Sequence, residues 1–172
     1  MNRSFRLVFG AAAALLLNGC AGYHLGTAHP QAMEGVHTVA VPTFTTTSLV
    51  PRLEVLAADS VIAELQRDGT YQVVSGDYAD AVIQGTISGV HRHPSRSIRS
   101  DVTGSREFTL TVDVKYTVTR RTTQEELQKG TVHGDTSFFV SGFDVNQDER
   151  QALPLALQNA AVRLVTQVTE GW

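Results

Sequence analysis

The chain has 172 residues, of which 42% are hydrophobic and 18% charged, and its formal net charge is −3 at pH 7. The single cysteine excludes a disulfide within the chain, so a folded domain must rest on its hydrophobic core. The negative charge argues against nucleic acid as a partner, because nucleic-acid binding needs a basic surface.

The first 19 residues have the pattern of an export signal. Arg3 and Arg6 form a positive head, residues 7–17 are almost all apolar or small, and the run stops just before Cys20. This run is shorter than the roughly 20 residues that cross a bilayer as a helix, so a transmembrane anchor is excluded. We expect residues 1–19 to be a signal peptide. Its removal leaves 172 − 19 = 153 residues with a charge of 12 − 17 = −5, a suitable length for one domain.

Residues 17–20, Leu-Asn-Gly-Cys, resemble a bacterial lipobox. In such signals the cysteine thiol receives a diacylglycerol, the chain is cut before the cysteine, and the new amino group is acylated, for example with palmitate. Several acyl chains make a stable anchor, since each buried methylene contributes about 0.8 kcal/mol. The resemblance implies that Cys20 is lipidated and that residues 20–35 form the lipidated N-terminus and its tether. The alternative is a free thiol that happens to follow an apolar leader.

The predicted folded domain, residues 36–172, begins with a strand and a helix. Residues 36–41 predict a strand that Pro42 ends. An apolar stripe at helical spacing then predicts a helix over residues 49–67, with Gly69 as its stop. The stripe consists of Leu53, Leu56, Ala57, Val61 and Leu65.

The middle of the domain predicts strands. Residues 71–75 form a short β-prone segment, and residues 81–91 predict a longer strand. Gly85 and Gly89 share one parity with Ile83 and Ile87, which suggests that a helix packs closely against the glycines.

The strongest local pattern lies between Phe108 and Thr119, where apolar residues alternate with threonines and charged residues. Such alternation predicts a strand with one buried and one wet face. Residues 130–140 predict the next strand, after a polar turn over residues 120–129.

A second apolar stripe predicts the last helix, with Asn146 and Glu149 as candidate capping residues. Pro154 deep inside a helix would cost ~3 kcal/mol, so the helix should begin near Ala152 or bend at Pro154. The element order β-α-β-β-β-α predicts an α+β domain with a four-stranded, largely antiparallel or mixed sheet and both helices on one face. The stripe consists of Leu153, Leu157, Ala160, Leu164 and Val168.

Five short motifs, in this order and spacing, resemble the LptE family of lipopolysaccharide-assembly lipoproteins. The resemblance implies two helices against a four-stranded sheet and a lipid-anchored position on the periplasmic side of the outer membrane. It also implies a partner, the β-barrel LptD, which such lipoproteins plug and help to fold, and direct binding of lipopolysaccharide. The motifs are CAGYHL at 20–25, VAVP at 39–42, PRLE at 51–54, ADAVIQG at 79–85 and EFTL at 107–110.

The connection between the two long strands is basic in an otherwise acidic protein, with Asp101 as its one acid. Guanidinium groups bind phosphates and carboxylates, which lipopolysaccharide carries, so this connection is the candidate glycolipid-binding site. The alternatives are a solvated hairpin tip and a contact with an acidic barrel wall. The candidate residues are Arg92, Arg96, Arg99 and Arg106.

The sequence gives little support for a metal site or for catalysis. His91 and His93 should share one face of a strand and could offer two metal ligands, but a closed site needs four, so we expect no metal. The paired acids Glu125 and Glu126 lie in a polar turn, and no catalytic motif is present, so we expect neither an enzyme nor a cofactor. The competing hypotheses are an accessory lipoprotein of an envelope ABC transporter or of a peptidoglycan synthase, and a periplasmic hydrolase with an unfamiliar site.

Overall fold

The computed structural model describes residues 30–96, 106–140 and 145–171. The predicted signal peptide, Cys20 and the first part of the predicted tether lie outside these residues. In chain order the elements are η2 (Gln31–Met33), β1 (Thr38–Ala40), β2 (Thr45–Thr46), α2 (Leu53–Asp68), β3 (Gln72–Val73), η3 (Gly76–Tyr78), β4 (Ala81–Arg96), β5 (Arg106–Arg120), β6 (Glu126–Val140) and α3 (Val145–Glu170).

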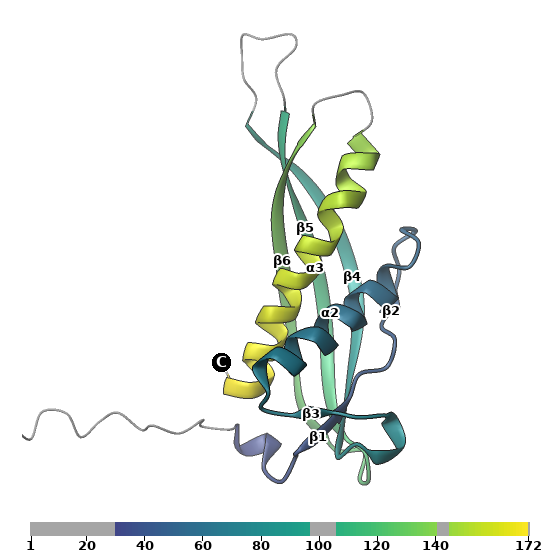
Figure 1. Cartoon of the computed structure of the whole chain (residues 1–172), viewed down its shortest axis with the longest axis vertical. Coiled ribbons are helices and arrows are strands. Elements are labelled where there is room, and N and C mark those ends of the chain that lie inside the picture. Colours follow the sequence, from purple (N-terminus) through teal and green to yellow (C-terminus); the bar gives the residue numbers. More distant parts are fainter. Residues whose placement is uncertain (1–29, 97–105, 141–144, 172) are drawn as a thin grey trace, which may run out of the picture.

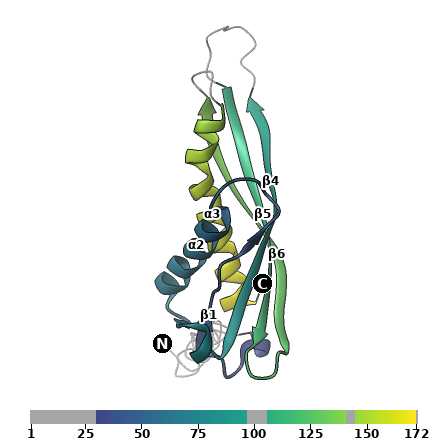
Figure 2. The same ribbon diagram turned by 90° about the vertical axis from the view of Figure 1, so that its right-hand side faces the viewer.

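The sheet has six strands and is mixed. Its order is β3-β1-β4-β5-β6, and β2 pairs with β4 beside this path. The long strands β4, β5 and β6 are antiparallel, whereas β1 and β2 pair parallel with β4, and β3 pairs parallel with β1. Both helices cover the same face of the sheet (Figures 1 and 2). The predicted α+β class and the one-sided helical cover are confirmed. The predicted number of four strands is wrong, because β2 and β3 have only two residues each and leave little periodic signal.

The three long strands carry the core on their helix face. On β5, Leu110, Val112, Val114, Tyr116 and Val118 are buried, as their alternation predicts. β4 and β6 are longer than predicted, since β4 continues to Arg96 and β6 begins at Glu126. The polar turn is therefore only residues 121–125.

A register shift between Ile87 and Gly89 reverses which residues face the helices in the second half of β4. Before the shift Ile87 is buried opposite Val114, and after it Val90 stands opposite Val112. Even-numbered residues of β4 consequently face the helices beyond the shift, and odd-numbered residues face away. Gly89 no longer shares the face of Ile87, so the prediction that a helix packs against it is wrong.

Gly85 does face the core, but the group packed against it is a phenylalanine and not a helix. A Cβ built at Gly85 would lie 2.2 Å from a ring carbon of Phe44, a buried residue in the segment before β2. The missing side chain makes room for this ring between the sheet and the helices.

The helix α2 ends where the sequence predicts. Gly69 adopts a left-handed conformation with φ of 77°, and its N–H donates to the carbonyl of Leu65 at 3.0 Å. Such a left-handed glycine is a common helix stop because it has no Cβ to clash.

The helix α3 begins at Val145 and runs through Pro154. Of the two predicted alternatives, the start near Ala152 is therefore wrong, and the helix continues through Pro154. The first two turns of α3 are mostly polar, so they contain no apolar stripe at helical spacing that could indicate a helix. Glu149 lies inside the helix and not at its cap. Further along, α3 approaches β6 so closely that a Cβ on Gly134 would lie 2.0 Å from the carbonyl oxygen of Ala156.

Asp80 joins β1 to the start of β4. Its Oδ2 accepts the N–H of His37 at 3.0 Å and both the N–H and the hydroxyl of Thr38 at 2.9 Å. These donors, the His37 N–H above all, hold the pKa of Asp80 below its ordinary value because they stabilise the carboxylate. The contacts fix the end of the sheet at which the N-terminal segment enters.

Neither helix of the described part of the chain combines the length and the hydrophobicity that crossing a membrane requires.

Candidate functional site

The predicted basic site lies at the end of the sheet remote from the N-terminal segment (Figure 1). β4 starts beside β1 and runs for 16 residues, which corresponds to about 50 Å of strand. At its far end, Arg96 stands opposite Glu107, and Arg106 stands opposite Val140. The backbone thus brings Arg92, Arg96 and Arg106 to one end of the molecule, while Arg99 lies outside the described residues.

Arg92 faces the helix side because of the register shift in β4. Its Nη1 lies 2.5 Å from Oε2 of Glu149 on α3, and its guanidinium lies 5.8 Å from the ring centre of Phe108. The Arg92 side chain is 38% exposed and that of Glu149 is 20% exposed. The guanidinium is therefore held between a carboxylate and an aromatic face and still reaches solvent.

Aromatic side chains form the floor beneath Arg92. The rings of Phe108 and Phe138 stack with centres 5.8 Å apart, joining β5 to β6. The next residue, Phe139, points to the other face of the sheet and is 62% exposed. This end of the molecule combines arginines with apolar rings, a combination suited to a ligand with both anionic groups and hydrocarbon.

The partnership of Arg92 with Glu149 could not be found from the sequence. The two residues are 57 positions apart, and no local period relates a residue on β4 to one on α3. An anionic ligand at Arg92 must compete with Glu149, whereas the backbone positions of Arg96 and Arg106 place them nearer the tip of the strands.

A second polar cluster lies on the helix-free face of the sheet. Asp113 lies at its centre, with Oδ2 3.1 Å from Nε2 of His91 and Oδ1 2.6 Å from Nδ1 of His133. The rings of His91 and His93 stack with centres 6.4 Å apart, so the prediction that both share one face is confirmed. Within residues 30–96, 106–140 and 145–171, no three ligating side chains are placed to hold a metal ion.

Glu125 and Glu126 do not face one another across a site. Glu125 lies in the turn before β6, and Glu126 begins that strand with its carboxylate 2.8 Å from the ammonium of Lys129. Both residues are exposed, as expected of solvated charges.

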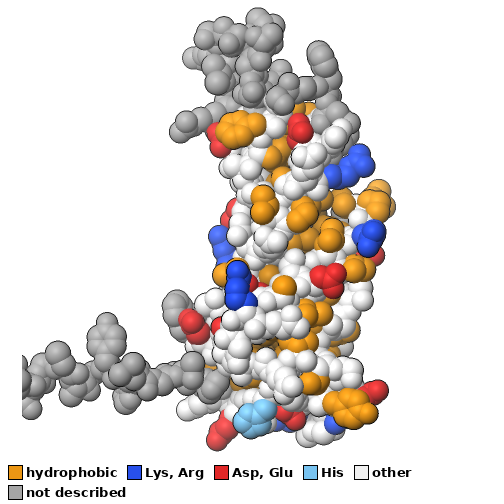
Figure 3. Space-filling model, in the orientation of Figure 1, with side chains coloured by type: hydrophobic (Ala, Val, Ile, Leu, Met, Phe, Trp, Pro, Cys, Tyr) orange, Lys and Arg blue, Asp and Glu red, His pale blue; other side chains and the backbone are white. Residues whose placement is uncertain are grey.

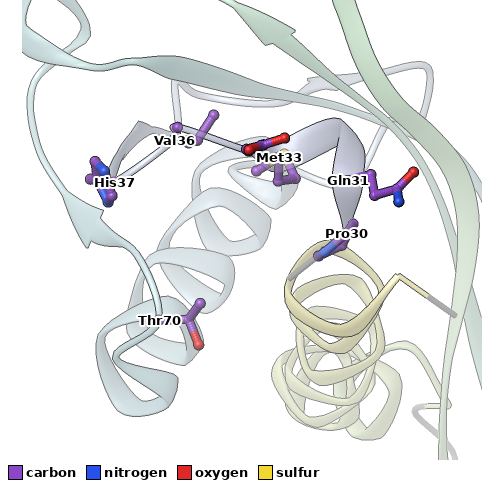
Figure 4. A pocket seen from close by; sticks show the side chains of 8 residues that line it. Pro30, Gln31, Met33, Val36, His37 and Thr70 are labelled. Carbon is purple, nitrogen blue, oxygen red and sulfur yellow. The ribbon is translucent and has the colours of Figure 1, made fainter. Parts of the chain in front are cut away.

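A pocket of about 280 Å³ opens at the opposite end, where the N-terminal segment enters. Pro30, Met33, Val36, His37 and Thr70 line it, and Figure 4 shows Pro30 beside the last turn of α3. A Cβ on Gly171 would come within 3.1 Å of the Pro30 ring, so the described N-terminal segment packs on the end of α3. This pocket and the arginines occupy opposite ends of the molecule.

Residues 36–168 match the family LptE, described as lipopolysaccharide-assembly. No curated protein sequence matches the chain significantly.

Solved structures share the fold at low sequence identity. A minor lipoprotein of Acinetobacter baumannii has 13% identity and a TM-score of 0.53, over 79% of this chain and 92% of the other. A protein of Xanthomonas campestris has 14% identity and a TM-score of 0.53, over 78% and 85%. A homologue of the neuraminyllactose-binding hemagglutinin from Helicobacter pylori has 13% identity and a TM-score of 0.52, over 87% and 93%. At such identities the likeness shows the fold alone.

Proposed function

Because the chain belongs to the LptE family of lipopolysaccharide-assembly proteins, we propose that it is an outer-membrane lipoprotein that works with an LptD-like β-barrel in lipopolysaccharide transport and assembly. The match over residues 36–168 carries the proposal, since it covers almost the whole folded domain. In this role the acylated Cys20 anchors the domain on the periplasmic side of the outer membrane. The domain itself is a rigid plug and folding partner for the barrel.

The one-sided architecture supports a plug. Helices α2 and α3 cover one face of the sheet and leave the other face uncovered (Figure 2). The uncovered face carries hydroxyl, imidazole and charged side chains, among them His91, Asp113 and His133. A barrel lumen is lined by polar side chains, so the open polar face is suited to contact it. The role needs no catalytic group, and we propose that the protein is not an enzyme.

Copurification tests the partnership. The protein should be captured through an affinity tag from detergent-solubilised outer membranes, and a large β-barrel should copurify with it. Recovery of soluble periplasmic proteins alone would refute the barrel partnership. Mass spectrometry of the same sample tests the anchor, because a lipidated Cys20 adds the mass of its acyl groups.

We further propose that the arginine end contacts lipopolysaccharide. Arg96, Arg99 and Arg106 would bind its phosphates and carboxylates, and Arg92 would join them when an anion displaces Glu149. Replacing Arg96 and Arg99 with alanine should weaken lipopolysaccharide binding in vitro.

The matched control for this experiment is the double variant Lys115→Ala, Lys129→Ala, which removes the same charge. Lys115 is exposed on the helix-free face, and Lys129 lies near the start of β6. Equal loss of binding in the control would mean that only net charge matters, and unchanged binding in the arginine variant would refute the site while leaving the plug role intact.

A further inference from the structure

The ion pair between Arg92 and Glu149 joins β4 to the start of α3 at the arginine end of the molecule. Glu149 lies in the second turn of α3, four residues after Val145. Its Oε2 is 2.5 Å from Nη1 of Arg92, and both side chains are partly exposed. Anions in solution can therefore reach the guanidinium while the carboxylate occupies it.

The first two turns of α3 bury few side chains. The side chains of residues 147–151 are all exposed or half-buried. Among the side chains of α3 that the structure describes, the first buried ones are those of Ala152 and Leu153. Pro154 follows them, and a proline has no N–H to donate back to the preceding turn. Residues 145–151 therefore contribute little to the core and can leave the sheet at less cost than the rest of α3.

Apolar side chains lie beneath these turns. Phe138 and Val140 are buried, and they share the face of Gly134, on which α3 packs closely. The half-buried Phe108 stacks on Phe138, and α3 starts over this end of the strands in Figures 1 and 2. Figure 3 shows hydrophobic and acidic side chains next to one another at this end of the described surface. Movement of the first turns would uncover aromatic rings beside Arg92.

We propose that Glu149 is an internal competitor for Arg92, and that an amphiphile with a phosphate group beside hydrocarbon chains displaces it. The ligand then lies between Arg92 and the rings of Phe108 and Phe138, and the first turns of α3 move aside. The inference deepens the proposed lipopolysaccharide contact and rests on it. A phosphate monoester carries about −1.5 to −2 charges at pH 7, so it binds a guanidinium more strongly than the single charge of a carboxylate does.

The competition makes the site selective for ligands that combine the two chemistries. Glu149 belongs to the same chain as Arg92, so it acts at an effective concentration that is typically in the millimolar range. A small anion at lower concentration does not displace it. Hydrocarbon that covers the exposed rings supplies the remaining free energy by burial of apolar surface. Free phosphate and neutral detergent each lack one of the two contributions.

Glu149→Gln tests the competition, because glutamine has nearly the same size and no charge. The full-length lipidated protein is immobilised in detergent, and its affinity for lipopolysaccharide and for deacylated lipopolysaccharide is measured on a biosensor. The matched control is Glu126→Gln, which removes an equal charge and the ion pair with Lys129, whose atoms are 2.8 Å apart at the other end of β6. Circular dichroism checks that each variant is folded.

Glu149→Gln should bind the deacylated form about two- to fivefold more tightly than wild type, because an exposed ion pair has about this strength. The control should bind like wild type. Equal affinities of Glu149→Gln and wild type would overturn the inference. Equal gains in both variants would also overturn it, since only net charge would then matter.

Hydrogen exchange measured by mass spectrometry tests the movement of α3. Residues 145–151 should exchange faster in unliganded Glu149→Gln than in wild type, and faster in wild type once lipopolysaccharide is bound. Unchanged or slower exchange on binding would overturn the inference and leave the lipopolysaccharide contact intact. If neither wild type nor the variant bound lipopolysaccharide, the proposed contact itself would fail, and the inference would fail with it.

Discussion

Replacing Gly134 with alanine should destabilise the domain more than any other exchange of a described glycine for alanine. A Cβ at this position would lie 2.0 Å from the carbonyl oxygen of Ala156 and 2.5 Å from the backbone nitrogen of Ala160. Real Cβ atoms essentially never come closer than 3.0 Å, so α3 must move away by at least 3.0 − 2.0 = 1.0 Å. The clashing atoms belong to helix backbone, and no side-chain rotation can relieve the clash.

The cost follows from what a displaced α3 loses. A gap of 0.5–1 Å forfeits roughly a quarter to a half of each van der Waals contact across it. Nine α3 residues between Ala152 and Val168 are buried hydrophobics, and many of them pack on β5 and β6. Overpacking usually costs about 1–3 kcal/mol, and we expect about 3 kcal/mol here because the whole helix is affected. For a domain of this size, this lowers Tm by roughly 6–12 °C.

The assay is urea denaturation of the mature chain followed by circular dichroism. The matched control is Gly76→Ala, because a Cβ at Gly76 meets no atom within 4 Å and the backbone there is not left-handed. The control should stay within about 0.5 kcal/mol of wild type. A Gly134→Ala protein that is as stable as the control would refute the close packing of α3 on β6.

Three further predictions concern the core and the entry end of the sheet. Gly85→Ala should lower the free energy of unfolding in urea by about 1–3 kcal/mol, because the new Cβ meets the Phe44 ring. Adding Phe44→Leu to the same chain should recover part of this loss. The absence of any recovery would contradict the contact. Asp80→Ala should cost about 1 kcal/mol at pH 7, reduced by solvent screening. The pKa of Asp80 in the folded state lies below its unfolded value near 3.9. The stability that the carboxylate contributes is therefore fully present above about pH 3.9 and is lost as the pH falls through the folded pKa. If the Asp80→Ala exchange lowered the free energy of unfolding equally at pH 7 and pH 2, this would argue against the carboxylate contacts. Tyr116→Phe should lose about 1 kcal/mol because its hydroxyl donates to Oε1 of Gln167 at 3.0 Å, and thermal melts that coincide with wild type would show that bond to be unimportant.

The long strands and the helices could be predicted because each buries one face. The alternation along β5 identified its buried residues, and the stripe from Leu53 to Leu65 identified the inner side of α2. A period of 2 or 3.6 in the apolar residues follows directly from burial of one face, so the sequence alone predicts these elements.

The sequence predictions were wrong where burial produces no local period in the apolar residues. The register shift after Ile87 changes which face each later residue of β4 occupies, and it depends on pairing with β5 that no sequence window contains. It determines that Arg92, and not His91, faces α3. Pro154 lies inside α3 because the buried Leu153 and Ala156 on either side of it offset the lost hydrogen bond.

The candidate site could be predicted only in outline. The basic composition of the connection identified the arginines, but their partners belong to other elements. Glu149 reaches Arg92 from α3, and Phe138 extends the aromatic floor from β6. Contacts between residues so far apart in the chain come from tertiary packing, which no motif records.

The antiparallel ribbon of β4, β5 and β6 makes the molecule a stiff spacer. Bending it enough to bring its ends together would break the hydrogen-bonded ladder that joins the three strands. A glycolipid bound at the proposed arginine site would therefore be held at a fixed separation from the entry end, set by the roughly 50 Å of β4 and comparable to the roughly 40–45 Å thickness of a bilayer with its headgroups. A longer or shorter tether would move the whole spacer relative to the membrane and leave that separation unchanged.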